Sequence, residues 1–298
     1  MSSGGRLRVS VILVNYNDGP HLEACLESVR TTIPSGREII LVDNASTDGS
    51  ADRAAAFFPE VRLIANPTNV GFSRANNRAV GESRGEFLLF LNTDTVLAPG
   101  AVEALLKEAG KDLEVGAAGP ALIRGPGRYQ VSFGRRVNFP SQFLQKAVVN
   151  PYRKAQLRFA RKTRPVGWLS AACLLCRREA FAAVGGFDER FFIYFEDIDL
   201  CLRMRKAGWK LLYVPAAEVV HEGGATTAPR RGLSRLEYRR SQVAFYEKHN
   251  SRASLVLLRA YLRTALALGR WRGAFRGPEG RELRRDYRAL LGRGRRGG

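Results

Sequence analysis

The sequence predicts an α/β fold in which a mostly parallel central sheet is flanked by helices and followed by a C-terminal helical extension. Short β-rich runs alternate with helical patterns through the first 120 residues, which is typical of parallel strands joined by crossover helices. Residues 86–92 are apolar almost throughout, as expected of a strand buried on both faces. Hydrophobic residues make up 45% of the 298-residue chain, enough for a large packed core.

The first half of the chain is predicted to alternate strictly between strands and helices. Strands are expected over residues 9–15, 38–43, 61–66 and 86–92. Helices are expected after Pro20, after the turn residues 44–50, and over 71–83 and 99–109. The first of these helices is expected to contact the sheet through one apolar face, formed by Leu22, Cys25, Leu26 and Val29.

The alternation is interrupted in the second half. Residues 125–165 begin with Gly125, Pro126 and Gly127 and mix aromatic with basic side chains, so a loop or hairpin over the cleft is expected. Strands are expected over 166–176 and 210–220, and helices over 179–184, 196–207 and 233–248. An arginine-rich tail follows from residue 251, with leucines at helical spacing: Leu255, Leu258, Leu262 and Leu266.

The formal net charge of +20 is distributed unevenly. Residues 1–124 hold 12 Lys and Arg against 15 Asp and Glu (−3), residues 125–250 hold 23 against 10 (+13), and residues 251–298 hold 13 against 3 (+10). The basic second half favours an anionic partner such as a membrane surface. The sequence carries no DNA- or RNA-binding motif and its N-terminal half is not basic, so no nucleic-acid partner is predicted. A basic nucleic-acid- or membrane-binding protein remains the alternative from a different class.

The four cysteines are too few and too widely spaced for a disulfide framework. Cys173 and Cys176 lie inside an apolar run and are expected to be buried strand residues. The N-terminal apolar run, residues 9–14, is too short for a secretory signal, and no run reaches the ~20 apolar residues that span a bilayer. These features predict a cytoplasmic protein, with peripheral attachment to the cytosolic membrane face through the tail as an option.

Polar residues follow three of the predicted strands at their carboxyl ends, where parallel α/β sheets bind ligands. Asp94 follows the strand 86–92 and is suited to hold Mg²⁺ or Mn²⁺ against phosphates; the alternative is a loop residue or helix cap. Asp43 ends another strand and is suited to accept a hydrogen bond from the N3–H of uracil or thymine. An Asx-turn with Ser46 or Thr47 is compatible with that role.

Three acids lie among aromatic residues in the segment 191–203: Glu196, Asp197 and Asp199. Apolar surroundings make a carboxylate more basic, as a general base requires. The alternative is an acidic helix N-terminus in which Asp199 pairs with Arg203. His221 follows the last predicted strand and is either a metal ligand or an ordinary loop or core residue.

Taken together, these segments resemble the inverting GT-A glycosyltransferases of family 2, especially the rhamnosyltransferase-like branch, which have a Rossmann-like sheet. Six segments carry the resemblance in family order: VSVILVNYN (9–17), LVDNASTDGS (41–50), NVGFSRANN (69–77), LLFLNTDT (88–95), residues 167–203 from GWLSAAC to FEDIDLCLR, and AGWKLLYVPAAEVVHEGG (207–224). The resemblance implies a donor-nucleotide half over about 8–124, an acceptor half over about 125–250, and a separate basic amphipathic tail over 251–298.

The resemblance also implies a role for individual residues. Asp197 would be the general base, and Asp94 and His221 would bind a divalent cation, Mg²⁺ or Mn²⁺. Trp168 and Glu196 would contact the acceptor. The donor nucleotide would be bound by Asn15, Tyr16, Asp43 and Asn76.

Two departures from the family pattern stand out. The first Asp of the family's Asp-x-Asp motif is Asn92, which removes one charge near the cation, and Ser170-Ala171-Ala172 stands where many relatives have a glycine. The expected reaction moves rhamnose from dTDP-rhamnose to a hydroxyl of a lipid-linked or cell-surface polysaccharide precursor, with a UDP-hexose donor as the alternative. A nucleotidyltransferase is disfavoured, because the loop after residue 15 lacks the glycines and the basic residue that such a phosphate loop needs.

The basic tail has two interpretations. Its leucine stripe could lie on an anionic membrane with the arginines toward lipid phosphates, since the acceptor of many relatives is lipid-linked. Alternatively, the stripe packs on the catalytic domain.

Overall fold

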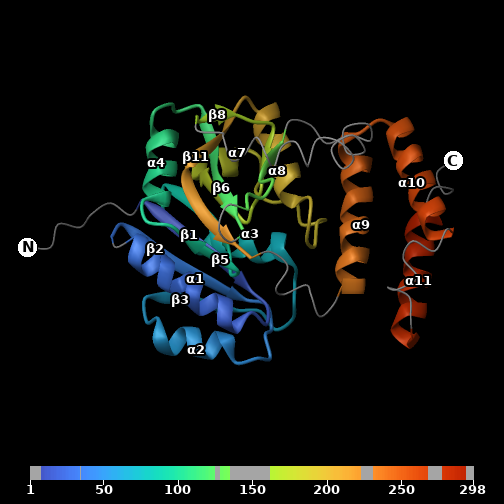
Figure 1. The fold of residues 1–298 in the computed structure, drawn as a ribbon, viewed down its shortest axis with the longest axis horizontal. Helices are drawn as coiled ribbons and strands as arrows, with labels where there is room; N and C mark the ends of the chain where they lie inside the picture. Colours follow the sequence, from blue (N-terminus) through green and yellow to red (C-terminus); the bar gives the residue numbers. More distant parts are fainter. Residues whose placement is uncertain are drawn as a thin grey trace, which may run out of the picture.

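The computed structural model describes residues 8–33, 35–124, 128–134, 162–222, 231–267 and 277–292. Within these ranges the chain forms a nine-stranded sheet of order β3-β2-β1-β4-β10-β6-β11-β5, with β8 paired to β11 (Figure 1). A second, two-stranded sheet joins β7 and β9. The strands are β1 (Val9–Asn15), β2 (Arg37–Asp43), β3 (Val61–Ala65), β4 (Phe87–Asn92), β5 (Thr95–Leu97), β6 (Val115–Ile123), β7 (Phe133–Gly134), β8 (Arg164–Pro165), β9 (Trp168–Leu169), β10 (Cys173–Arg177) and β11 (Lys210–His221). The predicted α/β fold with a mostly parallel central sheet is confirmed.

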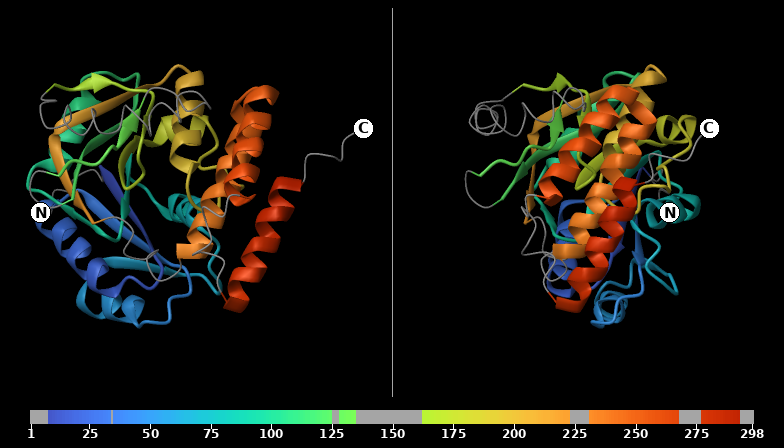
Figure 2. Two further views of the ribbon diagram at one scale, coloured as in Figure 1. Left: turned by 45° about the vertical axis from the view of Figure 1, so that its right-hand side comes forward. Right: turned by 90° about the vertical axis from the view of Figure 1, so that its right-hand side faces the viewer.

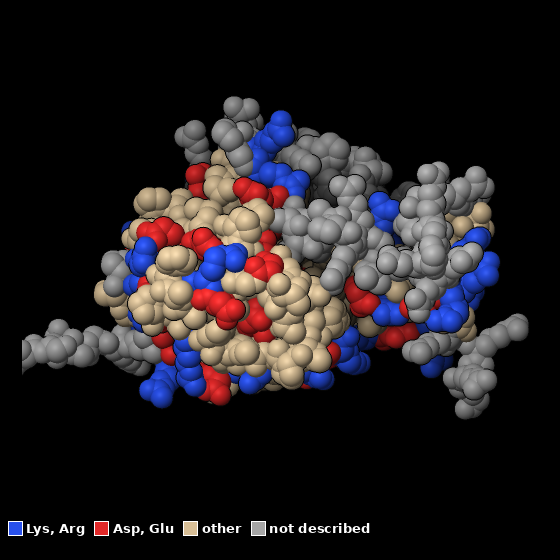
Figure 3. All heavy atoms as spheres, turned by 90° about the horizontal axis from the view of Figure 1, so that it is seen from below, with Lys and Arg blue, Asp and Glu red and all other residues tan. Residues whose placement is uncertain are grey.

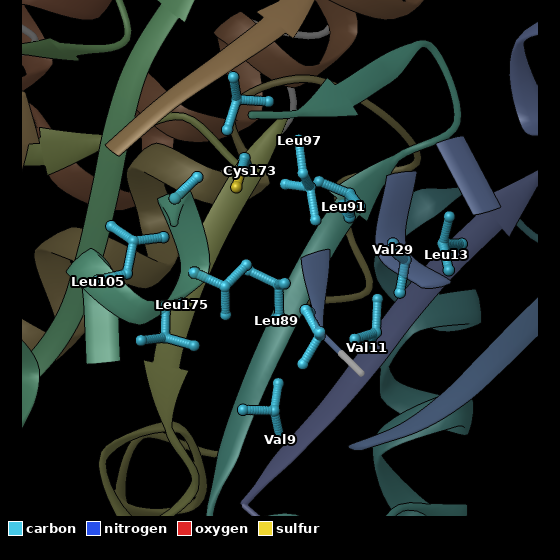
Figure 4. Packing of buried hydrophobic residues seen from close by; sticks show 14 of the residues in the cluster. Val9, Val11, Leu13, Val29, Leu89, Leu91, Leu97, Leu105, Cys173 and Leu175 are labelled. Carbon is cyan, nitrogen blue, oxygen red and sulfur yellow. The ribbon is translucent and has the colours of Figure 1, made fainter. Parts of the chain in front are cut away.

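Helices cover both faces of the sheet, so the domain has three layers. One face is covered by α1 (Gly19–Thr32), α2 (Ser50–Phe57) and α4 (Ala101–Gly110), and the other by α3 (Phe72–Glu82), α7 (Arg178–Ala183) and α8 (Glu196–Lys206). Alternate residues of a strand enter opposite layers: Val11 lies in the first and Ile12 in the second. Figure 4 shows the first layer, where Val9, Val11 and Leu89 pack together. The four cysteines are free and buried, as expected.

Parallel pairing places the ends of the first strands side by side. β1 and β2 pair in parallel up to the register Asn15↔Asp43, and β1 and β4 pair up to Val14↔Asn92. The polar residues predicted to converge on one edge therefore do so. This edge carries the candidate site.

Strands β5 and β6 were not expected from the sequence, and the two-residue strands β7 and β8 lie in the segment expected to be a loop or hairpin. A further expected strand has different bounds. β6 contains glycine, proline and three alanines, and its small residues leave room for neighbours: a Cβ at Gly119 would lie 2.9 Å from Leu169 Cδ2. β5 contains only three residues. The strand expected over 166–176 is divided into β9 and β10, because β9 pairs with β7 while β10 runs antiparallel to β4. Most of the loop expected over 125–165 lies outside the described residues.

The C-terminal part forms three helices, α9 (Arg231–His249), α10 (Arg252–Ala267) and α11 (Gly277–Gly292). They lie side by side at one end of the molecule, with α10 and α11 beyond α9 as seen from the sheet (Figures 1 and 2). Leu258 and Leu262 of α10 are buried in a cluster with Phe195 and Phe245. The leucine stripe therefore packs on protein, which agrees with the second interpretation of the tail. No helix in the described part of the chain has both the length and the apolarity of a membrane span.

Candidate active site

The first group of site residues follows β4. Asp94 is buried in the turn between β4 and β5, and His221 is the last residue of β11. β11 pairs with β5 in the register His221↔Thr95, which brings His221 Nε2 to 3.3 Å from Asp94 Oδ1. The two residues predicted to bind a cation, although distant in sequence, are thus neighbours.

The contacts of Gln130 indicate which ring nitrogen of His221 carries a proton. Gln130 Nε2 donates a hydrogen bond to the His221 carbonyl oxygen, and Gln130 Oε1 lies 2.9 Å from His221 Nδ1. An amide oxygen only accepts, so Nδ1 is a nitrogen that carries a proton, and when the ring is neutral Nε2 keeps its lone pair. A lone pair and a carboxylate oxygen then face each other, an arrangement that suits a cation bound between them.

The donor set of this pair fits Mg²⁺ or Mn²⁺ that completes its coordination with substrate phosphates and water. Within the described residues no group of three or more His, Cys, Asp or Glu side chains could enclose a metal ion. Asp94 and His221 would therefore be the protein's contribution, and phosphate oxygens would supply further ligands.

A second acid–histidine pair lies beside the first and was missed in the sequence. The buried carboxylate of Asp18 accepts hydrogen bonds from Thr93 Oγ1 (2.6 Å) and His21 Nδ1 (2.7 Å), while His21 Nε2 lies 3.2 Å from Glu222 Oε2. Burial raises the pKa of Asp18. Burial alone would lower the pKa of His21, but the Asp18 carboxylate raises it. The i,i+3 spacing of Asp18 and His21 at a helix start was the available signal.

Asp197 lies at the start of α8, after two residues with left-handed backbone: Tyr194 (φ 71°) and Phe195 (φ 69°). Its carboxylate accepts hydrogen bonds from the backbone N–H groups of Ala171 (3.2 Å) and Ile198 (2.7 Å). Burial raises the pKa of Asp197 to about 6, although these hydrogen bonds favour the charged form. Strained backbone beside a desolvated carboxylate is typical of a functional site.

Backbone contacts connect Asp197 to the same end of the sheet as Asp94. Ala171, which donates to Asp197, is followed by Ala172, whose carbonyl oxygen accepts a hydrogen bond of 2.9 Å from the N–H of Asn92. Asn92 is the last residue of β4, two positions before Asp94. The structure thus brings the predicted base and the predicted cation ligands to one edge.

Two predicted acceptor-binding residues lie beside Asp197. Glu196 is buried, and burial together with the Asp197 charge raises its pKa well above the usual value. Glu196 Oε2 and Trp168 Nε1 are buried without a hydrogen-bond partner among the described residues. Trp168 packs so closely on Gly134 that a Cβ at Gly134 would overlap its Nε1. Unpartnered polar atoms of this kind suit the binding of a hydroxylated ligand, and that role remains a prediction.

Asp199, the third acid of the segment, has a different environment. Its side chain is fully buried and lies 2.7 Å from Arg203 Nε, 2.6 Å from His249 Nε2 and 2.6 Å from Lys248 Nζ. Burial alone would raise the pKa of Asp199, but these partners lower it. The predicted i,i+4 pair with Arg203 is confirmed, and Asp199 joins α8 to α9.

Of the residues predicted to bind the nucleotide, Asn15 and Asp43 end β1 and β2, Tyr16 follows β1, and Asn76 lies on α3. Asn15 Nδ2 donates to Asp43 Oδ1 (2.9 Å) and Ser50 Oγ (2.7 Å), and Asp43 Oδ2 accepts from the Ser46 N–H (3.0 Å), the Asx-turn contact expected from the sequence. Asn76 Nδ2 donates to a carbonyl of its own helix. Asn15 and Asn76 are fully buried and offer a ligand almost no surface, whereas Tyr16 is partly exposed. Nucleotide contact remains a prediction for all four.

The sheet and the helices on its two faces form a GT-A fold, and its polar edge lies where ligands bind in such sheets. Two solved structures share the fold at 18% identity: GalNAc-T7 with UDP, GalNAc and Mn²⁺ (TM-score 0.58, covering 82% of this chain and 50% of that one), and the mannosyltransferase PcManGT from Pyrobaculum calidifontis with GDP-Man and Mn²⁺ (TM-score 0.56, covering 97% and 86%). Residues 10–185 match the family model "Glycosyl transferase family 2", and the chain belongs to this family.

Curated relatives agree with the family and with the rhamnosyltransferase-like branch expected from the sequence. The chain is 38% identical over 277 residues to the N-acetylglucosaminyl-diphospho-decaprenol L-rhamnosyltransferase of Mycobacterium tuberculosis, covering 87% of this chain and 90% of that one. It is also 31% identical to the O-antigen biosynthesis protein RfbC of Myxococcus xanthus, over 74% of this chain and 18% of that protein.

Proposed function

We propose that this chain is a cation-dependent, inverting rhamnosyltransferase. Its donor is dTDP-rhamnose, and its acceptor is a hydroxyl of a lipid-linked N-acetylglucosaminyl diphosphate. The observation that carries the proposal is the position of Asp197, a desolvated carboxylate with a pKa raised to about 6, at the strand edge that bears Asp94 and His221. Similarity to a rhamnosyltransferase over 90% of that protein's length supports the sugar and the acceptor.

The side chains support a single displacement. Asp197 takes the proton of the acceptor hydroxyl while that oxygen attacks the anomeric carbon, and the bond from this carbon to the diphosphate oxygen breaks with its electron pair on the diphosphate. Burial and the charge of Asp197 raise the pKa of Glu196, which favours a neutral Glu196 beside an ionised Asp197 and suits one proton transfer.

Asp94 and His221 Nε2 would hold the divalent cation. When bound, that cation supplies positive charge next to the departing diphosphate. Asp18 fixes the loop that carries Asp94 through its hydrogen bond from Thr93 Oγ1. The donor would lie over residues 8–124 and the acceptor over residues 125–250.

A donor panel tests the proposal. Purified full-length protein with Mg²⁺ or Mn²⁺ and a short-chain N-acetylglucosaminyl diphosphate lipid would be given dTDP-rhamnose, UDP-glucose, UDP-galactose, UDP-N-acetylglucosamine or GDP-mannose. Nucleotide diphosphate release should be fastest from dTDP-rhamnose, and NMR should show an anomeric configuration opposite to that of the donor. Faster release from a UDP-hexose would favour the alternative donor, and a retained configuration would contradict the single displacement.

A further inference from the structure

Helix α10 is apolar on two opposite sides. Its inner side packs on α9 and α11 through Leu258 and Leu262. Its outer side exposes Val256 (64%) and Leu257 (52%), which are among the most exposed large hydrophobic side chains of the described residues. The uncharged outer face also includes the exposed residues Ala253, Ala260, Thr264 and Ala267.

These six residues form one continuous stripe. At 100° per residue they fall within a sector of about 100° along the 16-residue helix. The hydroxyl of Thr264 donates to the Ala260 carbonyl oxygen of the same helix (3.0 Å), so its hydrogen bond is satisfied within the helix. A surface helix of a globular domain normally exposes charged residues along this face. The absence of charge in the stripe indicates contact with an apolar phase or partner.

One edge of the stripe is lined by arginines. Arg252, Arg259 and Arg263 fall within about 40° of one another, next to Val256. Arg252 and Arg263 are exposed, whereas Arg259 is mostly buried and pairs with Glu247 (2.7 Å). Residues 251–298 contain 13 Lys and Arg against 3 Asp and Glu, a net of +10. Figure 3 shows basic side chains along the outer end of the molecule, where α10 and α11 lie. An apolar stripe with a basic edge is the pattern of helices that lie in a membrane interface.

We propose that the outer face of α10 docks on an anionic phospholipid bilayer, with the helix parallel to the surface. Val256 and Leu257 enter the boundary between headgroups and acyl chains, and the exposed arginines of the edge, Arg252 and Arg263, face the lipid phosphates. Charge selects lipid over a second copy of this chain, because residues 251–298 carry a net charge of +10 and two such surfaces repel each other. The stripe has only two large apolar side chains, too few to bury the ~800 Å² per partner that a stable dimer interface needs.

A vesicle flotation assay on the full chain tests the docking face. The vesicles contain phosphatidylcholine alone or with phosphatidylglycerol, and the test variant is Val256→Asp/Leu257→Asp. Its matched control is Phe57→Asp/Leu113→Asp, which adds the same two charges at side chains that are 64% and 77% exposed elsewhere. The partition coefficient on anionic vesicles should fall at least about tenfold for the test variant and change less than about twofold for the control.

Two outcomes would overturn the inference. One is equal flotation of the two double variants. The other is sedimentation velocity showing a wild-type dimer that the Val256/Leu257 variant converts to a monomer while vesicle binding stays unchanged. All four positions are exposed, so melting temperatures should match. Transfer to a short-chain acceptor without vesicles should be the same for all three proteins, which separates this test from the proposed function.

Discussion

The two ends of the site use the same side-chain type, a buried carboxylate, in opposite electrostatic surroundings. At the donor end, Asp94 lies beside His221 and Asp18 beside His21. At the acceptor end, no ion pair with a cationic side chain of the described part of the chain is seen for Asp197 or Glu196, and burial raises both of their pKa values. The comparison shows how one residue type can serve two purposes: under the proposed function, the donor end would bind a cation and the acceptor end would bind a proton.

The difference arises from what covers each end. The donor end is built from loops after β1, β4 and β11 and reaches solvent through Glu222, which is largely exposed. The acceptor end lies where α8 meets the aromatic side chains of α9: the ring of Phe195 is 5.3 Å from those of Tyr238 and Phe245. Aromatic cover disfavours the ionised form of a nearby carboxylate. Burial also raises the pKa of Asp18 at the donor end, but there the hydrogen bonds from Thr93 and His21 favour the ionised form.

Removal of the cation should reduce transfer the most, because the negative charge of the departing diphosphate is then left without a counter-charge. Chelation by EDTA should abolish transfer, and excess Mg²⁺ or Mn²⁺ should restore it. Nucleotide diphosphate release measures the effect, and EDTA saturated with Mg²⁺ beforehand is the control. Full activity in EDTA would show that Asp94 and His221 do not act through a metal.

Asp197→Asn should affect the acceptor end alone. Asparagine keeps the size of the side chain but cannot take the proton, so kcat should fall at least ~100-fold. The dissociation constant of the donor nucleotide, measured by calorimetry, should stay within about threefold, since the donor end is intact. Near-normal turnover would refute the assignment of the base.

Gln130→Leu should weaken cation binding at the donor end without replacing either predicted cation ligand. The variant loses the acceptor that keeps the proton on His221 Nδ1. Affinity for Mn²⁺ in the presence of dTDP, measured by electron paramagnetic resonance, should fall about 10–100-fold. Gln130→Glu retains a carboxylate oxygen for Nδ1–H and should recover most of the affinity. Equal affinities in both variants would exclude this role.

The pH dependence of kcat/KM should reflect the ionisation of Asp197 at the acceptor end. Asp197 acts only when ionised, and burial raises its pKa to about 6, so activity is present above that value and lost as pH falls through it. At saturating Mn²⁺, kcat/KM should fall about tenfold per unit below pH 6. The residual activity of Asp197→Asn should lack this limb. A wild-type profile that is flat from pH 5 to 7 would contradict the raised pKa.

Much of this comparison could be predicted from the sequence, because alternating apolar runs identify β1, β2 and β4 and their polar ends. The Asp18–His21 pair could not, since its link to Thr93 depends on how two loops pack. Which side of α10 is exposed could not be predicted from the sequence either. A helix with two apolar stripes does not reveal which one is buried, and here the surface of α9 decides it.

Asp199→Asn should have the smallest effect on turnover and the clearest effect on stability. Asp199 is the shared partner of Arg203, Lys248 and His249. Loss of its charge leaves the largely buried Arg203 and Lys248 without their shared counter-ion and removes the carboxylate beside His249. The free energy of unfolding should fall by about 3–5 kcal/mol. At a temperature where the variant is folded, kcat should fall only a few-fold, because Asp197 keeps its own backbone hydrogen bonds.

Glu189→Gln is the matched control for Asp199→Asn. It removes one carboxylate from an exposed ion pair with Arg74 (2.9 Å), so the free energy of unfolding should change by less than about 1 kcal/mol. Urea unfolding and single-turnover transfer measure the two quantities on the same samples. If Asp199→Asn kept its stability but lost turnover as severely as Asp197→Asn, the proton acceptor would be Asp199. The roles of the ion-paired carboxylate, Asp199, and the desolvated carboxylate, Asp197, would then have to be exchanged.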